Sequence, residues 1–86
     1  MHLYEKGKMY KKLSEVKIGH KVIIKSFLND EIFLKLMEMG CVPGEEIYIE
    51  KIAPFKDPIS IVVSGYKLSL RLDEAEHILV EEIVYI

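Results

Sequence analysis

The side chains that could bind a metal ion are few and scattered along this chain. Imidazole and thiol ligands are limited to His2, His20, His77 and Cys41. None of them stands in a close pair such as Cys-x-x-Cys or His-x-x-x-His, the spacing that brings two ligands to one ion. The simplest interpretation is a buried apolar cysteine, surface histidines, and methionines that serve the core or an adaptable contact face. The sequence therefore predicts no metal site and no cofactor, with at most weak or incidental binding of divalent cations.

Catalytic groups are equally hard to place. The serines lie outside any Gly-x-Ser-x-Gly context, and none has an obvious histidine to act as its base. There is also no Gly-x-x-x-x-Gly-Lys-Ser/Thr loop that would hold a nucleotide phosphate. We therefore expect no catalytic residue and a protein that is not an enzyme.

Composition narrows the function classes further. The chain has 86 residues, of which 50% are hydrophobic, and this suits one domain with one core. The 12 Lys and Arg, only one of them arginine, stand against 14 Asp and Glu, so we expect no nucleic-acid partner. No run of about 18 apolar residues is present, so direct membrane insertion is not expected either. A single cysteine, and lysines with no apolar stretch behind them at the N-terminus, favour the cytoplasm.

The elements that must position these residues are mostly strands. Apolar runs, most of them alternating with polar residues, predict five strands, around 22–24, 47–49, 59–63, 66–70 and 78–83. Ser64 and Gly65 separate two of these runs and predict a tight hairpin. Asp73 is expected to cap a single helical turn before the last strand. Five short strands in so few residues favour a small, partly closed barrel, because closure removes strand edges.

One helix is predicted between the first two strands. Asn29 and Asp30 offer N-cap oxygens to a helix from about Glu31 to Met39. Gly40 is placed to end that helix in the left-handed conformation. The apolar residues that would form its buried face are Ile32, Phe33, Leu36, Met37 and Met39.

The first twelve residues follow no hydrophobic period. We expect residues 1–12 to form an N-terminal arm that frays or lies along a sheet edge, ahead of a barrel domain at 13–86.

Glycine, proline and leucine at the corners form a pattern that resembles a known family. The pattern consists of Leu36, Met39-Gly40, Pro43-Gly44, Ala53-Pro54, Asp57-Pro58, Gly65, Leu70-Arg71, Ala75 and Ile78 to Val80. Over about Leu13 to Val80 the chain resembles FeoA, the small cytoplasmic accessory protein of bacterial ferrous iron transport. Two positions depart from the family pattern. The corner Phe55-Lys56 lacks the glycine often found before the aspartate, and Cys41 replaces an aliphatic residue.

This resemblance implies an SH3-like barrel without enzymatic activity. It also implies an interaction with the cytoplasmic side of FeoB, the membrane protein that carries ferrous iron and has a GTP-binding domain. The alternative function is a stand-alone metal-sensing or transcription-linked interaction domain, because the same barrel occurs in metal-dependent repressors resembling the diphtheria toxin repressor. Residues 1–12 are too few for a DNA-reading helix-turn-helix, which favours the transport function. The sequence fixes neither the direction of regulation nor the oligomeric state.

The hypothetical partner contact is the end of the helix and the loop behind it. Its residues are Leu36, Met37, Met39, Gly40, Cys41, Val42, Pro43 and Gly44. A helix with more apolar residues than one narrow stripe has some left for a second surface. The alternative is that all of these residues form the core, with the glycines present for backbone reasons.

Overall fold

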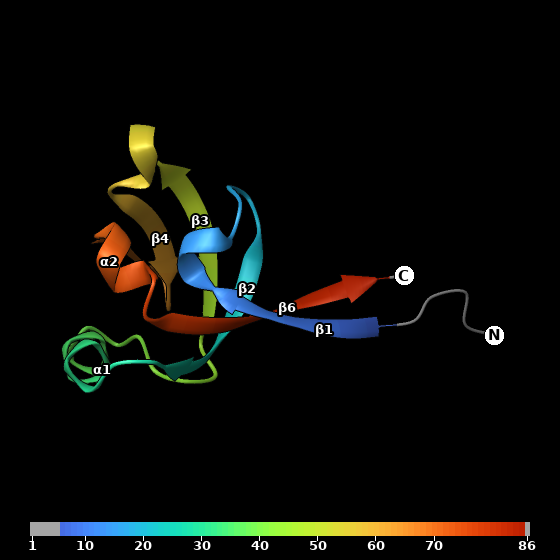
Figure 1. Cartoon of the computed structure of the whole chain (residues 1–86), viewed down its shortest axis with the longest axis horizontal. Helices are drawn as coiled ribbons and strands as arrows, with labels where there is room; N and C mark the ends of the chain where they lie inside the picture. The colour runs from blue at the N-terminus through green and yellow to red at the C-terminus, as the bar shows by residue number, and fades with distance from the viewer. Residues whose placement is uncertain (1–5, 86) are drawn as a thin grey trace.

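A computed structural model describes residues 6–85 as one antiparallel sheet with short helices at its corners (Figure 1). The elements in chain order are β1 (Lys6–Lys12), η1 (Leu13–Glu15), β2 (Lys21–Phe27), α1 (Asp30–Glu38), β3 (Glu46–Ile52), η2 (Pro54–Lys56), β4 (Ile59–Val63), β5 (Tyr66–Leu70), α2 (Leu72–Ala75) and β6 (Ile78–Tyr85). The strand order across the sheet is β1-β6-β2-β3-β4-β5, and each neighbouring pair is antiparallel. The mainly β class, the helix ahead of β3 and the helical turn ahead of β6 confirm the prediction.

The predicted five strands omit β1, which forms one edge of the sheet. Lys6–Lys12 pairs along its whole length with β6, from Tyr85 to Leu79. In Figure 1 the two strands run away from the barrel together as a ribbon. The lysine-rich sequence of β1 hides the strand signal, because lysine is depleted in strands overall but common on exposed edges. Residues 1–5 of the expected arm lie outside the described residues.

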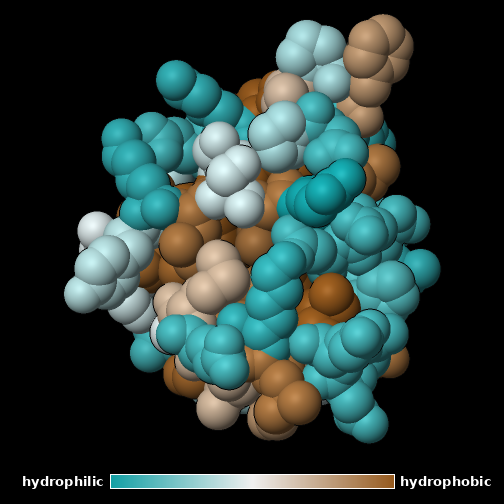
Figure 2. All heavy atoms as spheres, turned by 90° about the vertical axis from the view of Figure 1, so that its left-hand side faces the viewer, coloured by the Kyte–Doolittle hydropathy of each residue, from teal (hydrophilic) through white to brown (hydrophobic). Residues whose placement is uncertain are grey.

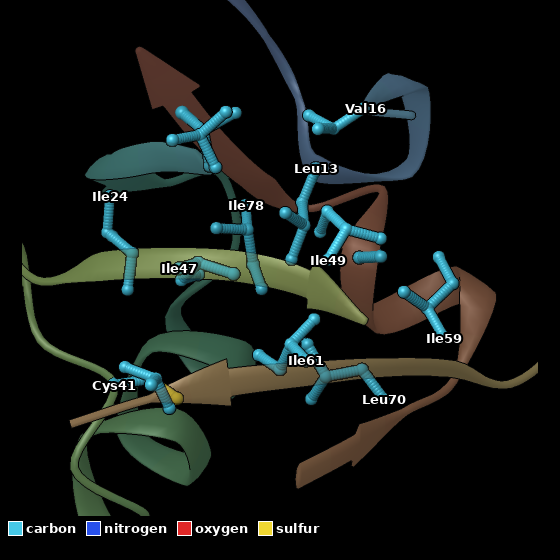
Figure 3. Close-up of a cluster of buried hydrophobic side chains, with 14 of the residues drawn as sticks. Leu13, Val16, Ile24, Cys41, Ile47, Ile49, Ile59, Ile61, Leu70 and Ile78 are labelled. Atoms are coloured by element: carbon cyan, nitrogen blue, oxygen red, sulfur yellow. The ribbon is translucent and has the colours of Figure 1, made fainter. Parts of the chain in front are cut away.

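One hydrophobic core lies inside the curled sheet. Its buried apolar side chains come from strands β2 to β6, from both α-helices, and from η1 and the loops. Along β3 and β4 the buried positions alternate with more exposed ones, so one face of each strand points inward. Leu13 and Val16, from η1 and the turn after it, point toward the same cluster (Figure 3). The chain thus forms one domain around one core.

The predicted Asn29 cap and the predicted Gly40 end of α1 are confirmed, whereas Asp30, the other expected cap, is the first residue of the helix. The side-chain oxygen of Asn29 accepts hydrogen bonds from the backbone N–H groups of Glu31 and Ile32, at 2.8 and 3.2 Å. At the other end Gly40 has a φ of 86°, which glycine adopts without the steric cost that a Cβ brings. The N–H of Cys41 donates to the carbonyl of Leu36 at 2.9 Å, which completes a Schellman motif.

The β4–β5 hairpin is also confirmed. Val63 faces Tyr66 across the two-residue turn, in which Ser64 and Gly65 both have positive φ, of 50° and 81°. Two positive values are the signature of the turn whose twist matches that of the strands.

The predicted cap of α2 is wrong. Because α2 begins at Leu72, Asp73 already lies inside its first turn. The carboxylate of Glu74 fills the capping role, since it accepts a hydrogen bond from the backbone N–H of Arg71 at 2.8 Å.

The corner between β3 and β4 has an unusual backbone. Phe55 and Lys56 have φ values of 65° and 63°, in the left-handed region that favours glycine. Lys56 occupies the position before Asp57 where the FeoA pattern often has glycine. The Phe55 side chain is 96% exposed at the tip of this corner.

Candidate partner-binding site

Helix α1 has an inward and an outward apolar face. Leu36 is fully buried, and Ile32 and Met39 pack against the core, so the inward part of the predicted face is confirmed. Phe33 and Met37, which were expected to widen that face, are 37% and 39% exposed. The helix therefore buries a narrower arc than its sequence predicts.

The predicted contact residues divide between the core and the surface. Leu36 and Cys41 are 0% and 1% exposed, so the core alternative is correct for these two and their side chains are closed to a partner in this conformation. The exposed members are Met37, Gly40, Pro43 and Gly44, and the half-buried ones are Met39 and Val42. The loop after α1 is thus accessible, while the residues beneath it hold it in place.

Sequence reasoning missed the most exposed apolar residue of α1. Leu34 is 63% exposed and falls outside the spacing of the buried face, and Leu28, just before the helix, is 52% exposed. An apolar residue out of step with the buried period was the signal that could have identified Leu34. Figure 2 shows brown and tan atoms between polar ones over the lower part of this side of the molecule, where α1 lies.

A shallow hollow lies beside the outward face of α1. It has a volume of about 300 Å³, and its lining includes Lys25 and Ser26 of β2, Asp30 and Phe33 of α1, and Pro43. Phe27 completes the lining and meets the Phe33 ring edge to face, with centroids 5.5 Å apart. The hollow thus joins the helix to the predicted contact loop through Pro43.

A buried carboxylate ties α1 to α2. The Glu74 carboxylate, on a residue only 5% exposed, accepts hydrogen bonds from the Lys35 ammonium and from the backbone N–H of Arg71. Burial alone raises the pKa of Glu74, but these two donors and the charges of Lys35 and Arg71 outweigh it and leave the pKa lowered. The pair joins the lysine side of α1 to the barrel and leaves the opposite side exposed.

The rings of His20 and His77 each lie within hydrogen-bond distance of an oxygen atom. His20 Nδ1 lies 2.7 Å from Glu82, whose carboxylate also accepts a hydrogen bond from Lys11 at 3.0 Å. The hydrogen bond with His20 and the ammonium of Lys11 lower the pKa of Glu82 against the opposing effect of burial. His77 Nδ1 lies 2.6 Å from the carbonyl oxygen of Asp73. His2 lies outside the described residues.

Cys41 is a buried thiol. Burial, and next the charge of Glu45, raise its pKa, so the reactive thiolate is disfavoured. Within residues 6–85, no three His, Cys, Asp or Glu side chains gather in a way that could hold a metal ion. None of the helices in the same range has the length and apolar character needed to cross a bilayer.

Comparison with protein families and solved structures gives a consistent result. The family model for the FeoA domain matches residues 11–82. An FeoA-like protein from Clostridium acetobutylicum, solved by NMR, is 46% identical, with a TM-score of 0.79 over 85% of this chain and 86% of that one. Stenotrophomonas maltophilia FeoA complexed with zinc, described as an SH3 domain protein, is 28% identical, with a TM-score of 0.72 over 84% and 95% of the two chains. The predicted SH3-like fold is therefore confirmed.

Two longer proteins contain a similar domain. A fusion protein of Fe(2+) transport protein A and the Fe(2+) transporter FeoB, from Porphyromonas gingivalis, is 36% identical over 71 residues. The match covers 81% of this chain but only 8% of the fusion protein. The IdeR protein of T. acidophilum has a TM-score of 0.75 over 85% of this chain and 34% of its own, at 24% identity, and this likeness concerns the fold alone.

Proposed function

The chain belongs to the FeoA family, and from this membership we propose that it is an accessory protein of ferrous iron transport that binds the cytoplasmic part of a FeoB-type transporter and modulates it. The observation that carries the proposal is the fusion relative, in which an FeoA unit and a FeoB transporter form one polypeptide. Fusion keeps two units at a high effective concentration, which is useful when they work in contact. We propose the same contact for this chain.

In this proposal the protein acts by binding its partner and not by catalysis. Its thiol is buried with a raised pKa, and the His20 and His77 rings lie against a carboxylate and a backbone carbonyl. GTP hydrolysis and ion movement would belong to the transporter, and the chain would act in the cytoplasm. Ferrous iron is the cargo of the partner in this proposal.

The contact surface that we propose includes the exposed part of the segment predicted from the sequence. Met37, Gly40 and Pro43 lie at the surface, at the end of α1 and in the loop behind it. Leu36 and Cys41 support this loop from the core, since the backbone N–H of Cys41 is bonded to the carbonyl of Leu36. A preformed loop loses little conformational entropy when it binds.

The alternative of a metal-sensing or transcription-linked domain has weaker support. The likeness to IdeR is at 24% identity and supports a shared fold, which does not imply a shared function. An FeoA-like protein and the fusion with FeoB reach 46% and 36% identity. We therefore propose the transport function and keep the sensor as the alternative.

Ferrous iron uptake tests the proposal in cells. A bacterial host without its own ferrous iron transporter would express the FeoB-type transporter from the same source as this chain, alone or with the chain. We expect the initial rate of ferrous iron uptake to differ severalfold between the two strains at equal transporter levels. Equal rates, with the chain present and folded, would argue against a modulating role.

A further inference from the structure

We propose that the outward face of α1, formed by Phe33, Leu34 and Met37, docks an amphipathic helix of the transporter that carries basic side chains along one flank. This inference rests on the proposed function and specifies the surface and the chemistry of the partner. The outward face extends the predicted contact loop by nearly a full turn of helix.

The three residues form one continuous stripe. At about 100° per residue, Leu34 lies about 160° around the helix axis from the buried Leu36, with Met37 and Phe33 following on one side of it. All three side chains are between 37% and 63% exposed. Met37 lies three residues after Leu34 and four after Phe33, and these are the spacings of the anchor residues by which an amphipathic helix is recognised in a groove.

The stripe is held in a fixed position. Asn29 caps the helix, Gly40 ends it, and Lys35 joins it to the buried Glu74 of α2. The inward face is packed against the core through Leu36. The outward face is therefore exposed while α1 is held in place on the barrel, and a partner would meet a preformed surface.

Carboxylates line one flank of this stripe. Glu31 and Glu38 are exposed, lie three residues before and four residues after Leu34, and take part in none of the ion pairs within the described residues. A carboxylate in the first turn stabilises a helix, which accounts for Glu31. Glu38 is the last residue of α1, where the helix dipole disfavours negative charge, so helix stability does not account for it.

The acidic flank discriminates between three possible occupants. A second copy of this chain, docked through the same face, would bring two sets of carboxylates together. A bilayer with anionic headgroups would be repelled by them. A partner helix with lysine or arginine along one edge would complement the charge and bury the apolar stripe, so this occupant is favoured.

The hollow beside Phe33 offers a place for an anchor side chain. Phe27, Phe33 and Pro43 supply apolar walls, and Lys25 and Asp30 supply polar groups to a volume of about 300 Å³. Binding energy at protein interfaces concentrates where an apolar anchor fills such a depression. A leucine or phenylalanine of the partner helix would fit this role.

A matched pair of variants tests the surface. Leu34→Asp places a charge in the stripe, at a residue that is 63% exposed. The control Ile18→Asp makes the same kind of change at a residue that is 56% exposed. Ile18 precedes the start of β2 and thus lies at the opposite end of that strand from α1. Binding to the detergent-solubilised transporter would be measured by biolayer interferometry, and folding by circular dichroism. We expect Leu34→Asp to raise Kd about 30-fold, as for an interface hot spot, and Ile18→Asp to change it less than about twofold.

Charge reversal tests the partner chemistry. The double variant Glu31→Lys, Glu38→Lys should raise Kd at least tenfold at low salt and make the affinity less dependent on salt than that of the wild type. An unchanged Kd, or a lower one, would overturn the proposal that the partner helix carries basic side chains along one flank.

The outcomes separate the surface from the function. If the wild-type chain does not bind the transporter, the proposed function itself is contradicted. If the wild type and Leu34→Asp bind the transporter equally well, only the proposed contact surface is contradicted. A wild-type dimer in sedimentation that Leu34→Asp converts to monomer would assign the face to a second copy. Wild-type co-sedimentation with phosphatidylglycerol vesicles, lost in Leu34→Asp, would assign it to the bilayer; either result overturns the proposal.

Discussion

Replacing Leu36 by alanine, beside the same change at its neighbour Met37, tests how α1 divides its apolar residues. Leu36 is 0% exposed and lies in the core, whereas Met37 is 39% exposed on the outward face. The two residues are adjacent in one helix, so propensity changes are nearly matched. Any large difference between the variants must come from packing.

The structure sets the size of the expected effect. Leu36→Ala removes three buried carbons, worth about 2.4 kcal/mol at about 0.8 kcal/mol each. The cavity left in a rigid core brings the total to about 3–4 kcal/mol. Met37→Ala should cost less than about 1 kcal/mol, because much of that side chain already contacts water. A chain of 86 residues has a typical free energy of unfolding of about 4–13 kcal/mol, so Leu36→Ala removes a large share of it.

Urea unfolding followed by far-ultraviolet circular dichroism measures both values. With a denaturant slope of about 1–3 kcal/mol per molar, the midpoint of Leu36→Ala should fall by about 1 M or more. The midpoint of Met37→Ala should move by no more than a few tenths of that. A loss below about 1 kcal/mol for Leu36→Ala, or equal losses for both variants, would refute the assignment of inward and outward faces.

Three further predictions follow from the helix end, the buried carboxylates and the thiol. Gly40→Ala should lower the free energy of unfolding by about 1 kcal/mol, and backbone strain at φ 86° is the cause because an added Cβ meets nothing within 4 Å. Asparagine adopts this conformation more readily than alanine, so an equal loss of unfolding free energy in Gly40→Asn, measured by urea unfolding, would argue against strain. The pKa values of Glu74 and Glu82 are lower in the folded chain than the ordinary glutamate value of 4.5, so as the pH falls the unfolded chain takes up protons on these groups before the folded chain does. The two carboxylates therefore stabilise the folded chain fully above pH 4.5, and this stabilisation is lost as the pH falls through their folded pKa values. Urea unfolding at a series of acid pH values should show the free energy of unfolding falling with pH, and falling less steeply in Glu74→Gln. A free energy of unfolding that does not change with pH in this range would contradict the prediction. The Cys41 thiol should react with a disulfide reagent at least a hundredfold more slowly in the folded chain than in urea, and equal rates would place it at the surface.

Features that depend on short-range sequence could be predicted well. The Asn29 cap, the Gly40 end of α1 and the Ser64-Gly65 hairpin each depend on the conformational preferences of a few consecutive residues. The burial of Cys41 agrees with its interpretation as a small apolar residue, and not with its place in the hypothetical contact segment.

Features that depend on distant parts of the chain could not be predicted in this way. Strand β1 exists because Lys6–Lys12 meets β6, more than sixty residues later, and its lysines belong to an edge. Local preference favoured Asp73 as the α2 cap, but Lys35, 39 residues earlier, stabilises the buried Glu74 in that role. The period of α1 located its inward face, whereas the width of that face depends on how the helix rests on the barrel. For this reason Leu34 was missed.

The measurement that tests the central claim most directly is binding of the purified chain to the FeoB-type transporter from the same source. The transporter would be solubilised in detergent and measured by biolayer interferometry, with and without a GTP analogue and ferrous iron, over a series of salt concentrations. An accessory protein of ferrous iron transport should bind saturably, with an affinity that depends on the nucleotide. Absence of binding under every condition, with the chain shown to be folded, would contradict the account and favour the metal-sensing alternative.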